Sequence, residues 1–124
     1  MTTVLLVEDE EVVLILAQSA LDEHGFETKT ATDITSATAL LDGDEPFDCL
    51  FTDINLSDGD GLELAVLFRA KFPTAAVLYT TGVVVTDGIR ARMVDGAELL
   101  SKPYRIEALV DSVRRLVSAA PHSN

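Results

Sequence analysis

The segment 47-FDCLFTDINLSDGDG-61 joins a mainly apolar run to an acidic loop that contains two glycines. Residues 47–52 have the pattern of a short strand that is buried on both faces. Asp53 stands where this run ends, and the Asp and Gly residues after it are typical of turns. Such a strand is typical of a parallel sheet, whose ligands bind beyond the carboxyl ends of the strands.

The rest of the chain repeats the same strand pattern. Apolar runs predict five strands, at residues 4–7, 26–31, 47–52, 75–80 and 97–101. Apolar residues at spacings of three and four predict a helix after each strand, at residues 12–21, 34–41, 62–71, 87–94 and 106–117. Asp33 is a suitable N-cap for the second helix.

Five consecutive strand–helix units predict an α/β fold in which helices cover both faces of a parallel sheet, because right-handed crossovers place them there. At 124 residues, we expect one doubly wound, flavodoxin-like domain with five strands in the order 2-1-3-4-5 and five helices. In the first helix, one helical face carries the apolar residues Val12, Val13, Leu16, Ala17, Ala20 and Leu21.

The chain contains no linker and no internal repeat, so we expect one domain over residues 1–120 and a disordered tail at 121–124. Met1 lies just before the first strand, which suggests a natural start. We expect no output domain after the last helix, and a segment cut from a longer chain is the alternative.

The composition limits the possible partners and locations. Nine basic residues against 21 acidic ones give a formal charge of −12, which disfavours binding to nucleic acid or to an anionic membrane. The sequence has neither a signal peptide nor an apolar run long enough to cross a membrane, and we expect a cytoplasmic protein. Its single cysteine, Cys49, cannot form an internal disulfide and fits a buried strand.

Chemically active side chains follow four of the predicted strands. Glu8 and Asp9 follow the first strand, Asp53 the third, Thr81 the fourth and Lys102 the fifth. Carboxylates brought together at one edge repel one another unless a proton or a cation intervenes, and oxygen ligands of this kind suit Mg²⁺. A carboxylate can also attack phosphorus, while an amine and a hydroxyl stabilise the phosphoryl oxygens.

These residues form four ordered motifs. They are Val7-Glu8-Asp9, the segment from Asp53 to Gly61, Thr81-Gly82 and Lys102-Pro103. Together they resemble the response-regulator receiver domain of two-component and phosphorelay signalling, here of the single-domain type. The likeness covers residues 3 to 118, and the four motifs in order, each at a strand end, are highly specific.

The resemblance implies a metal-assisted phosphorylation site. Asp53 would be the phosphoacceptor, in a reaction that depends on Mg²⁺. Glu8 and Asp9 would form the acidic pair, with Asp9 as a direct ligand of the metal. Asn55 would offer its backbone carbonyl to the metal, and Asp53 would be a further ligand.

The resemblance also assigns roles on the other side of the site. Thr81 would be the switch hydroxyl that turns toward the phosphoryl group, and Lys102 would pair with that group. The bond from Lys102 to Pro103 would be a candidate cis peptide. The donor would be a histidine kinase or a histidine phosphotransfer protein, and the downstream target is an unknown protein.

The sequence departs from the family in the loop and in the output region. Leu56-Ser57 replaces the common Met-Pro, which should loosen the loop after Asp53. Leu99 stands where an aromatic switch residue is usual. The segment 83–85 is unusually apolar, either as part of the core or as a surface for a partner. The candidate partner surface consists of Val83, Val84, Val85, Leu99 and Tyr104.

Three functions are consistent with these residues. The first is a phosphorylated receiver that loses its phosphate slowly, is a monomer or weak homodimer, and is not an enzyme with an external substrate. The second is an interaction domain of the same fold that is never phosphorylated. The third is a phosphate-ester hydrolase, because Asp53-Ile-Asn-Leu-Ser faintly resembles the haloacid-dehalogenase phosphatases. In that family a second aspartate acts as general acid, and Asn55 stands at its position here.

Overall fold

A computed structural model describes residues 1–119. A five-stranded parallel sheet with the order β2-β1-β3-β6-β7 forms its centre. These strands are β1 (Thr3–Val7), β2 (Glu27–Ala31), β3 (Cys49–Asp53), β6 (Ala76–Thr81) and β7 (Glu98–Ser101). The helices are α1 (Glu11–Glu23), α2 (Ile34–Leu41), α3 (Gly61–Lys71), α4 (Asp87–Arg92) and α5 (Ile106–Ala119). The tail predicted at residues 121–124 lies outside the described residues.

The predicted strand order is confirmed, because the five strands of the sheet follow the order 2-1-3-4-5 when they are counted along the chain. A small antiparallel pair, β4 (Asn55–Leu56) and β5 (Gly59–Asp60), lies in the loop after β3. Most predicted strand ends differ from the observed ones by one or two residues, and α4 ends two residues before its predicted end. Asp33 caps α2 as predicted, since its side chain accepts a hydrogen bond from the Ser36 amide.

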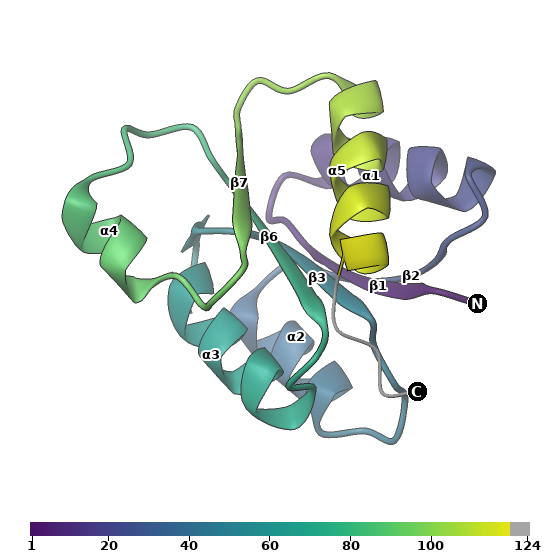
Figure 1. The fold of residues 1–124 in the computed structure, drawn as a ribbon, viewed down its shortest axis with the longest axis horizontal. Helices are drawn as coiled ribbons and strands as arrows, with labels where there is room; N and C mark the ends of the chain where they lie inside the picture. The colour runs from purple at the N-terminus through teal and green to yellow at the C-terminus, as the bar shows by residue number, and fades with distance from the viewer. Residues whose placement is uncertain (120–124) are drawn as a thin grey trace.

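Helices cover both faces of the sheet, so the core is divided into two parts. Helices α1 and α5 lie on one side, and α2 and α3 lie on the other (Figure 1). Alternate residues of each buried strand point into the two halves, as the pleat requires. In β3, for example, Leu50 belongs to the half under α2 and α3, whereas Cys49 and Phe51 belong to the half under α1 and α5.

The apolar face predicted for α1 is only partly buried, with Ala17, Ala20 and Leu21 inside the core. Leu14 is buried, whereas Val12 and Leu16 are 71% and 54% exposed. Helix α1 packs against β1, β2 and α5, and only the stripe that contains Leu14, Ala17 and Leu21 faces them. The apolar face is wider than this contact area, so helical periodicity alone selected some residues that point outward.

Helix α4 has only six residues, and none of them is buried. Before it, Val83 and Val84 are exposed and Val85 is half-buried, so Val83 and Val84 do not belong to the core. Leu99 is half-buried and packs on the core half under α2 and α3. Use of this segment by a partner therefore stays a prediction.

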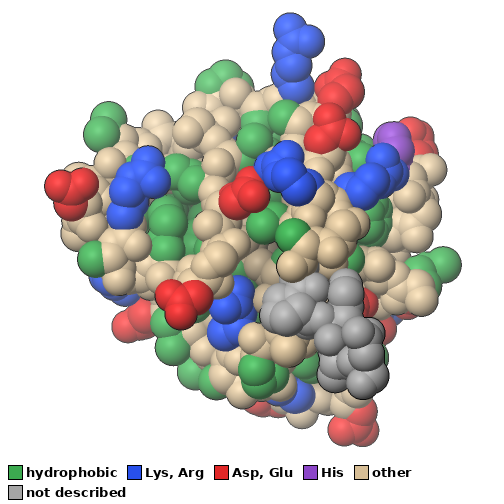
Figure 2. All heavy atoms as spheres, viewed as in Figure 1, with side chains coloured by type: hydrophobic (Ala, Val, Ile, Leu, Met, Phe, Trp, Pro, Cys, Tyr) green, Lys and Arg blue, Asp and Glu red, His purple; other side chains and the backbone are tan. Residues whose placement is uncertain are grey.

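The surface is of mixed character. On the face seen in Figure 2, acidic, basic and apolar side chains are interspersed, and no broad basic area appears on it. Within residues 1–119, no helix has both the length and the apolar character needed to cross a membrane.

Cys49 gives a test of the predicted core. It is 0% exposed, and burial followed by the nearby charge of Asp48 raises the pKa of its thiol to about 12. Because the thiolate is the reactive form, we expect Ellman's reagent to leave the folded chain unmodified at about pH 8. The reagent should label the chain fully in denaturant. Rapid labelling of the native chain would contradict this placement.

Candidate functional site

Four strand ends bring the predicted residues to one edge of the sheet. Glu8 follows β1, Asp53 ends β3, Thr81 ends β6 and Lys102 follows β7. Glu8, Asp53 and Thr81 are 3%, 5% and 1% exposed, so their polar groups depend on protein partners. Asp9, beside Glu8, is exposed. The predicted convergence of these residues is confirmed.

Three carboxylates form a compact cluster that can hold a metal ion. One oxygen each from Glu8, Asp9 and Asp53 lies within 4.8 Å of the others. Carboxylate oxygens are the ligands that Mg²⁺ prefers, and Mg²⁺ usually keeps several waters beside one or two protein ligands. The exposure of Asp9 leaves one side of the cluster open to water and to phosphate. The donor set therefore fits the ion that the family resemblance implies.

Lys102 forms ion pairs with both buried carboxylates. Its Nζ lies 2.7 Å from Oδ2 of Asp53 and 2.9 Å from Oε2 of Glu8. Burial favours the neutral amine, but hydrogen bonds to Asp53 and Glu8 outweigh it and raise the pKa of Lys102 above its ordinary value. For Glu8, burial raises the pKa and the contact with Lys102 offsets part of the increase. Lys102 is therefore fully charged at neutral pH.

Asn55 and Thr81 face each other across the site. The Asn55 side-chain amide donates to Oγ1 of Thr81 at 3.1 Å, and the Val83 amide donates to the same oxygen at 3.2 Å. The backbone amide of Asn55 donates to Oδ1 of Asp53 at 3.0 Å. The Thr81 hydroxyl oxygen thus accepts from two donors, one from each neighbouring loop.

Backbone hydrogen bonds and an apolar contact close the loop after Asp53. Asn55 pairs with Asp60 in the β4–β5 hairpin, and the Gly61 amide donates to the Ile54 carbonyl at 2.8 Å. Leu56 is 9% exposed and packs into the core half under α2 and α3. Backbone pairing and burial of Leu56 thus close the loop without proline, and loosening relative to a Met-Pro loop stays a prediction.

Two acidic residues that looked like simple turn formers have further contacts. Asp60 caps α3, accepting from the Leu62 amide at 2.6 Å, and pairs with Arg92 at 2.7 Å. Glu63 three residues later completes the pattern of a capping box, so the sequence contained this signal. Asp58 accepts hydrogen bonds from the start of α2, a distant contact that no local pattern predicts.

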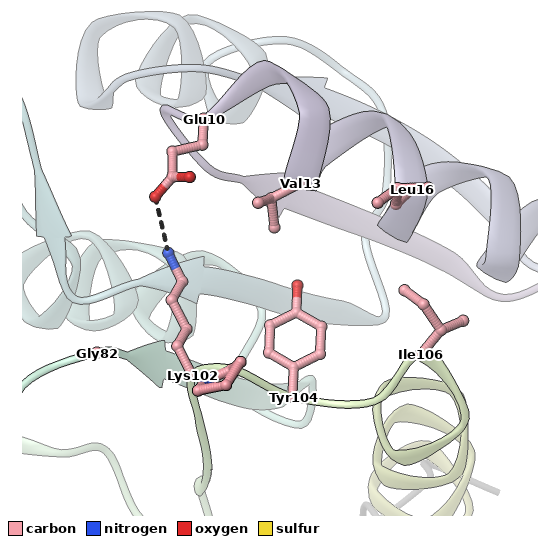
Figure 3. A pocket seen from close by; sticks show the side chains of 8 residues that line it. Glu10, Val13, Leu16, Gly82, Lys102, Tyr104 and Ile106 are labelled. Atoms are coloured by element: carbon pink, nitrogen blue, oxygen red, sulfur yellow. Dashed lines mark ion pairs between the residues drawn. The ribbon is translucent and has the colours of Figure 1, made fainter.

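A hollow of about 500 Å³ adjoins Lys102 between α1 and the start of α5. In Figure 3, Tyr104 stands in it with its hydroxyl directed toward α1, and Leu16 and Ile106 flank it. The Tyr104 ring packs edge-on against Phe51, and burial raises the pKa of its hydroxyl to about 12. The Tyr104 ring thus packs on the core half under α1 and α5, and its use by a partner stays a prediction. The cis bond predicted between Lys102 and Pro103 is confirmed.

The fold and the site define a class of protein. Residues 4–114 match the family of response regulator receiver domains, and the chain belongs to that family. It is a receiver domain of a two-component response regulator.

Individual relatives of the chain are response regulators or regulatory proteins. The chain is 30% identical to the response regulator receiver protein CpdR of Brucella abortus, over 97% of this chain and 100% of that protein. It is 34% identical over 93% of its length to the probable transcriptional regulatory protein TcrX of Mycobacterium tuberculosis. It is 28% identical over 96% of its length to the photosynthetic apparatus regulatory protein RegA of Rhodobacter capsulatus. It spans 49% of TcrX and 65% of RegA, so it covers about half to two thirds of these longer relatives.

Solved structures are similar over almost the whole chain. A response regulator receiver protein from Sinorhizobium medicae has a TM-score of 0.88 and 26% identity over 95% of each chain. The response regulator protein TrrA of Thermotoga maritima, in complex with Mg²⁺ and BeF, has a TM-score of 0.78 and 27% identity over 94% of this chain and 99% of that one.

Gly61 is predicted to be essential for the loop. A Cβ atom at this position would lie 2.1 Å from the Asp53 carbonyl oxygen, and this backbone cannot move aside easily. We expect Gly61→Ala to lower the free energy of unfolding by about 1–3 kcal/mol, measured by urea denaturation. Gly88→Ala is the control, because its Cβ would come no closer than 3.7 Å to Thr86. Equal stability of the two variants would contradict the loop geometry.

The raised pKa of Glu8 predicts that Mg²⁺ binding depends on pH in an unusual range. Its raised pKa means that it takes up a proton above its ordinary value of 4.5. Because ligands must be deprotonated, Mg²⁺ affinity should fall on acidification before an ordinary glutamate would titrate. Without metal, the folded state holds this proton more tightly than the unfolded state does. The free energy of unfolding should therefore fall as the pH rises above 4.5, which is the opposite direction to the change in Mg²⁺ affinity. Calorimetric titrations with Mg²⁺ at several pH values, with Glu8→Gln as control, measure the first effect. An affinity that stays constant down to the ordinary glutamate range would contradict it.

Proposed function

We propose that this chain accepts a phosphoryl group on Asp53 in a Mg²⁺-dependent reaction and signals through contacts with another protein. The observation that carries the proposal is the buried Asp53 carboxylate, held 2.7 Å from Lys102 and clustered with Glu8 and Asp9. A structural ion pair would need one carboxylate for one amine. Here three carboxylates meet one close amine, which leaves room for a cation.

The reaction is an in-line displacement at phosphorus. An oxygen of Asp53 forms a bond to phosphorus while the bond from phosphorus to the donor nitrogen breaks, and the electron pair of that bond leaves with the histidine. Glu8, Asp9, Asp53 and the Asn55 carbonyl would hold the Mg²⁺, which neutralises charge on the phosphoryl oxygens. Lys102 supplies the second positive charge and keeps it at neutral pH. Water later cleaves the acyl phosphate and restores the carboxylate.

Output would begin at Thr81. A phosphoryl oxygen on Asp53 is a stronger acceptor than any neutral group nearby, so the Thr81 hydroxyl would turn to donate to it. That rotation would release the Asn55 side chain and the Val83 amide, both of which now donate to Thr81 Oγ1. Val83 begins the apolar segment 83–85, in which Val83 and Val84 are exposed, so the change would reach the surface although position 99 holds a leucine and no aromatic residue.

The upstream partner would be a histidine kinase or a histidine phosphotransfer protein. Such a donor must bring a side chain to Asp53, and the hollow beside Lys102 is bordered by the exposed apolar Leu16 of α1 (Figure 3). An apolar side chain of the donor fits there better than a charged one. The receiver processes only its own phosphate and is not a turnover enzyme in this proposal.

The central prediction concerns Asp53. We expect acetyl phosphate with Mg²⁺ to add one phosphate to the wild-type chain, detected as a mass increase. Asp53→Asn should abolish the mass increase, because the neutral side-chain amide has no negatively charged oxygen to attack phosphorus. Asp44→Asn is the control: it removes an exposed carboxylate from the loop before β3, at the opposite end of that strand, and should be modified like the wild type.

The same experiment separates the alternatives. Equal incorporation in Asp53→Asn would contradict a phosphoacceptor role for this residue. An interaction domain without phosphorylation would be favoured if no phosphate is incorporated and a partner protein binds equally well with and without the phosphodonor. Profiling against the histidine kinases of the host identifies the upstream partner, and steady release of phosphate from an external ester would indicate a hydrolase.

A further inference from the structure

Asp58 binds the first turn of a helix that is distant in sequence. Its Oδ1 accepts from the Ile34 amide at 2.8 Å, and its Oδ2 accepts from the Thr35 amide at 3.1 Å and the Thr35 hydroxyl at 2.9 Å. The first amides of a helix have no partner within the helix, so a carboxylate satisfies them well. These hydrogen bonds lower the pKa of Asp58, so it is ionised at neutral pH.

Helix α2 already has a cap of its own. Asp33 accepts from the amide and the hydroxyl of Ser36, at 2.7 and 2.6 Å. Asp33 and Asp58 therefore bind different groups at the same helix end. Asp33 lies next to the helix in sequence, whereas Asp58 comes from the loop after the phosphoacceptor strand. Of these two carboxylates, only Asp58 connects this helix to the loop.

The short β4–β5 hairpin links Asp58 to Asn55, the residue proposed to offer its carbonyl to the metal. Asp58 lies at the turn of the β4–β5 hairpin, in which Leu56 pairs with Gly59 and Asn55 pairs with Asp60. The turn also packs closely on α2, since a Cβ atom at Gly59 would come within 3.0 Å of the Ile34 side chain. The other end of the hairpin carries Asn55, whose backbone amide holds Asp53 Oδ1.

We propose that Asp58 is a positioning residue: it anchors the hairpin to α2 and thereby fixes the Asn55 backbone for Mg²⁺ binding. The inference rests on the proposed function, because it concerns the same metal site. It also explains how a loop without the Met-Pro pair can be rigid. A loop held at one end only would lose conformational freedom on metal binding, and this loss weakens the affinity.

Asp58→Ala and Asp33→Ala form a matched pair for the test. Each removes one carboxylate from the same helix end, so thermal unfolding should shift downward in both. Isothermal titration with MgCl₂ should show about tenfold weaker binding for Asp58→Ala, as for other residues that support a ligand indirectly. Binding by Asp33→Ala should equal that of the wild type. Asp58→Asn keeps one acceptor oxygen, so its Mg²⁺ affinity should lie between that of Asp58→Ala and that of the wild type.

A second measurement needs no metal. Amide hydrogen exchange in the metal-free chain should speed up at Gly61, whose amide closes the loop on Ile54, in Asp58→Ala but not in Asp33→Ala. Equal Mg²⁺ affinity of the two alanine variants, or unchanged exchange at Gly61, would overturn the positioning role alone. Absence of Mg²⁺ binding by the wild-type chain would overturn the proposed function and this inference with it.

Discussion

The structure depends on one electrostatic arrangement: Lys102 holds the buried carboxylates of Asp53 and Glu8 at the edge of the sheet. Three carboxylates within 4.8 Å of one another repel, and the repulsion is strong between Asp53 and Glu8 because both are buried. The amine lies 2.7 and 2.9 Å from the two buried ones, so it relieves most of the repulsion between them. It leaves Asp9 without a close cation. The site is therefore stable enough to fold and still retains a charge imbalance that a cation can relieve.

Parallel strands make this arrangement possible. Each strand ends at the same edge, so residues that are as distant in sequence as Glu8 and Lys102 meet without long loops. The continuous apolar strands beneath them exclude water from the carboxylates, which raises the pKa of Glu8 and strengthens its contact with Lys102. The core and the site are thus coupled: the residues that stabilise the fold also set the electrostatics of the edge.

Much of this could be predicted from the sequence, because apolar strands and helical spacings are local patterns and strand ends converge by topology. The groups around Asp53 were found in this way. The predictions missed features that depend on tertiary contacts. In α1 the apolar face is wider than the contact with the sheet, so Leu16 points outward. The loop after Asp53 is closed by hairpin pairing and by Asp58, whose partners lie 23 and 24 residues earlier. Local patterns contain no information on such a distant partner.

The packing of the two loops at Thr81 indicates where a change at Asp53 can travel. The loop that carries Asn55 is pinned by hairpin pairing, burial of Leu56 and the hydrogen bonds of Asp58. The loop that begins at Val83 leads instead to α4, a six-residue helix without a buried residue. In the proposed switch Thr81 would release both donors, and the pinned loop would then have little freedom to move while the lightly packed segment would have much more. The signal would therefore leave through residues 83–92, because that side resists displacement least.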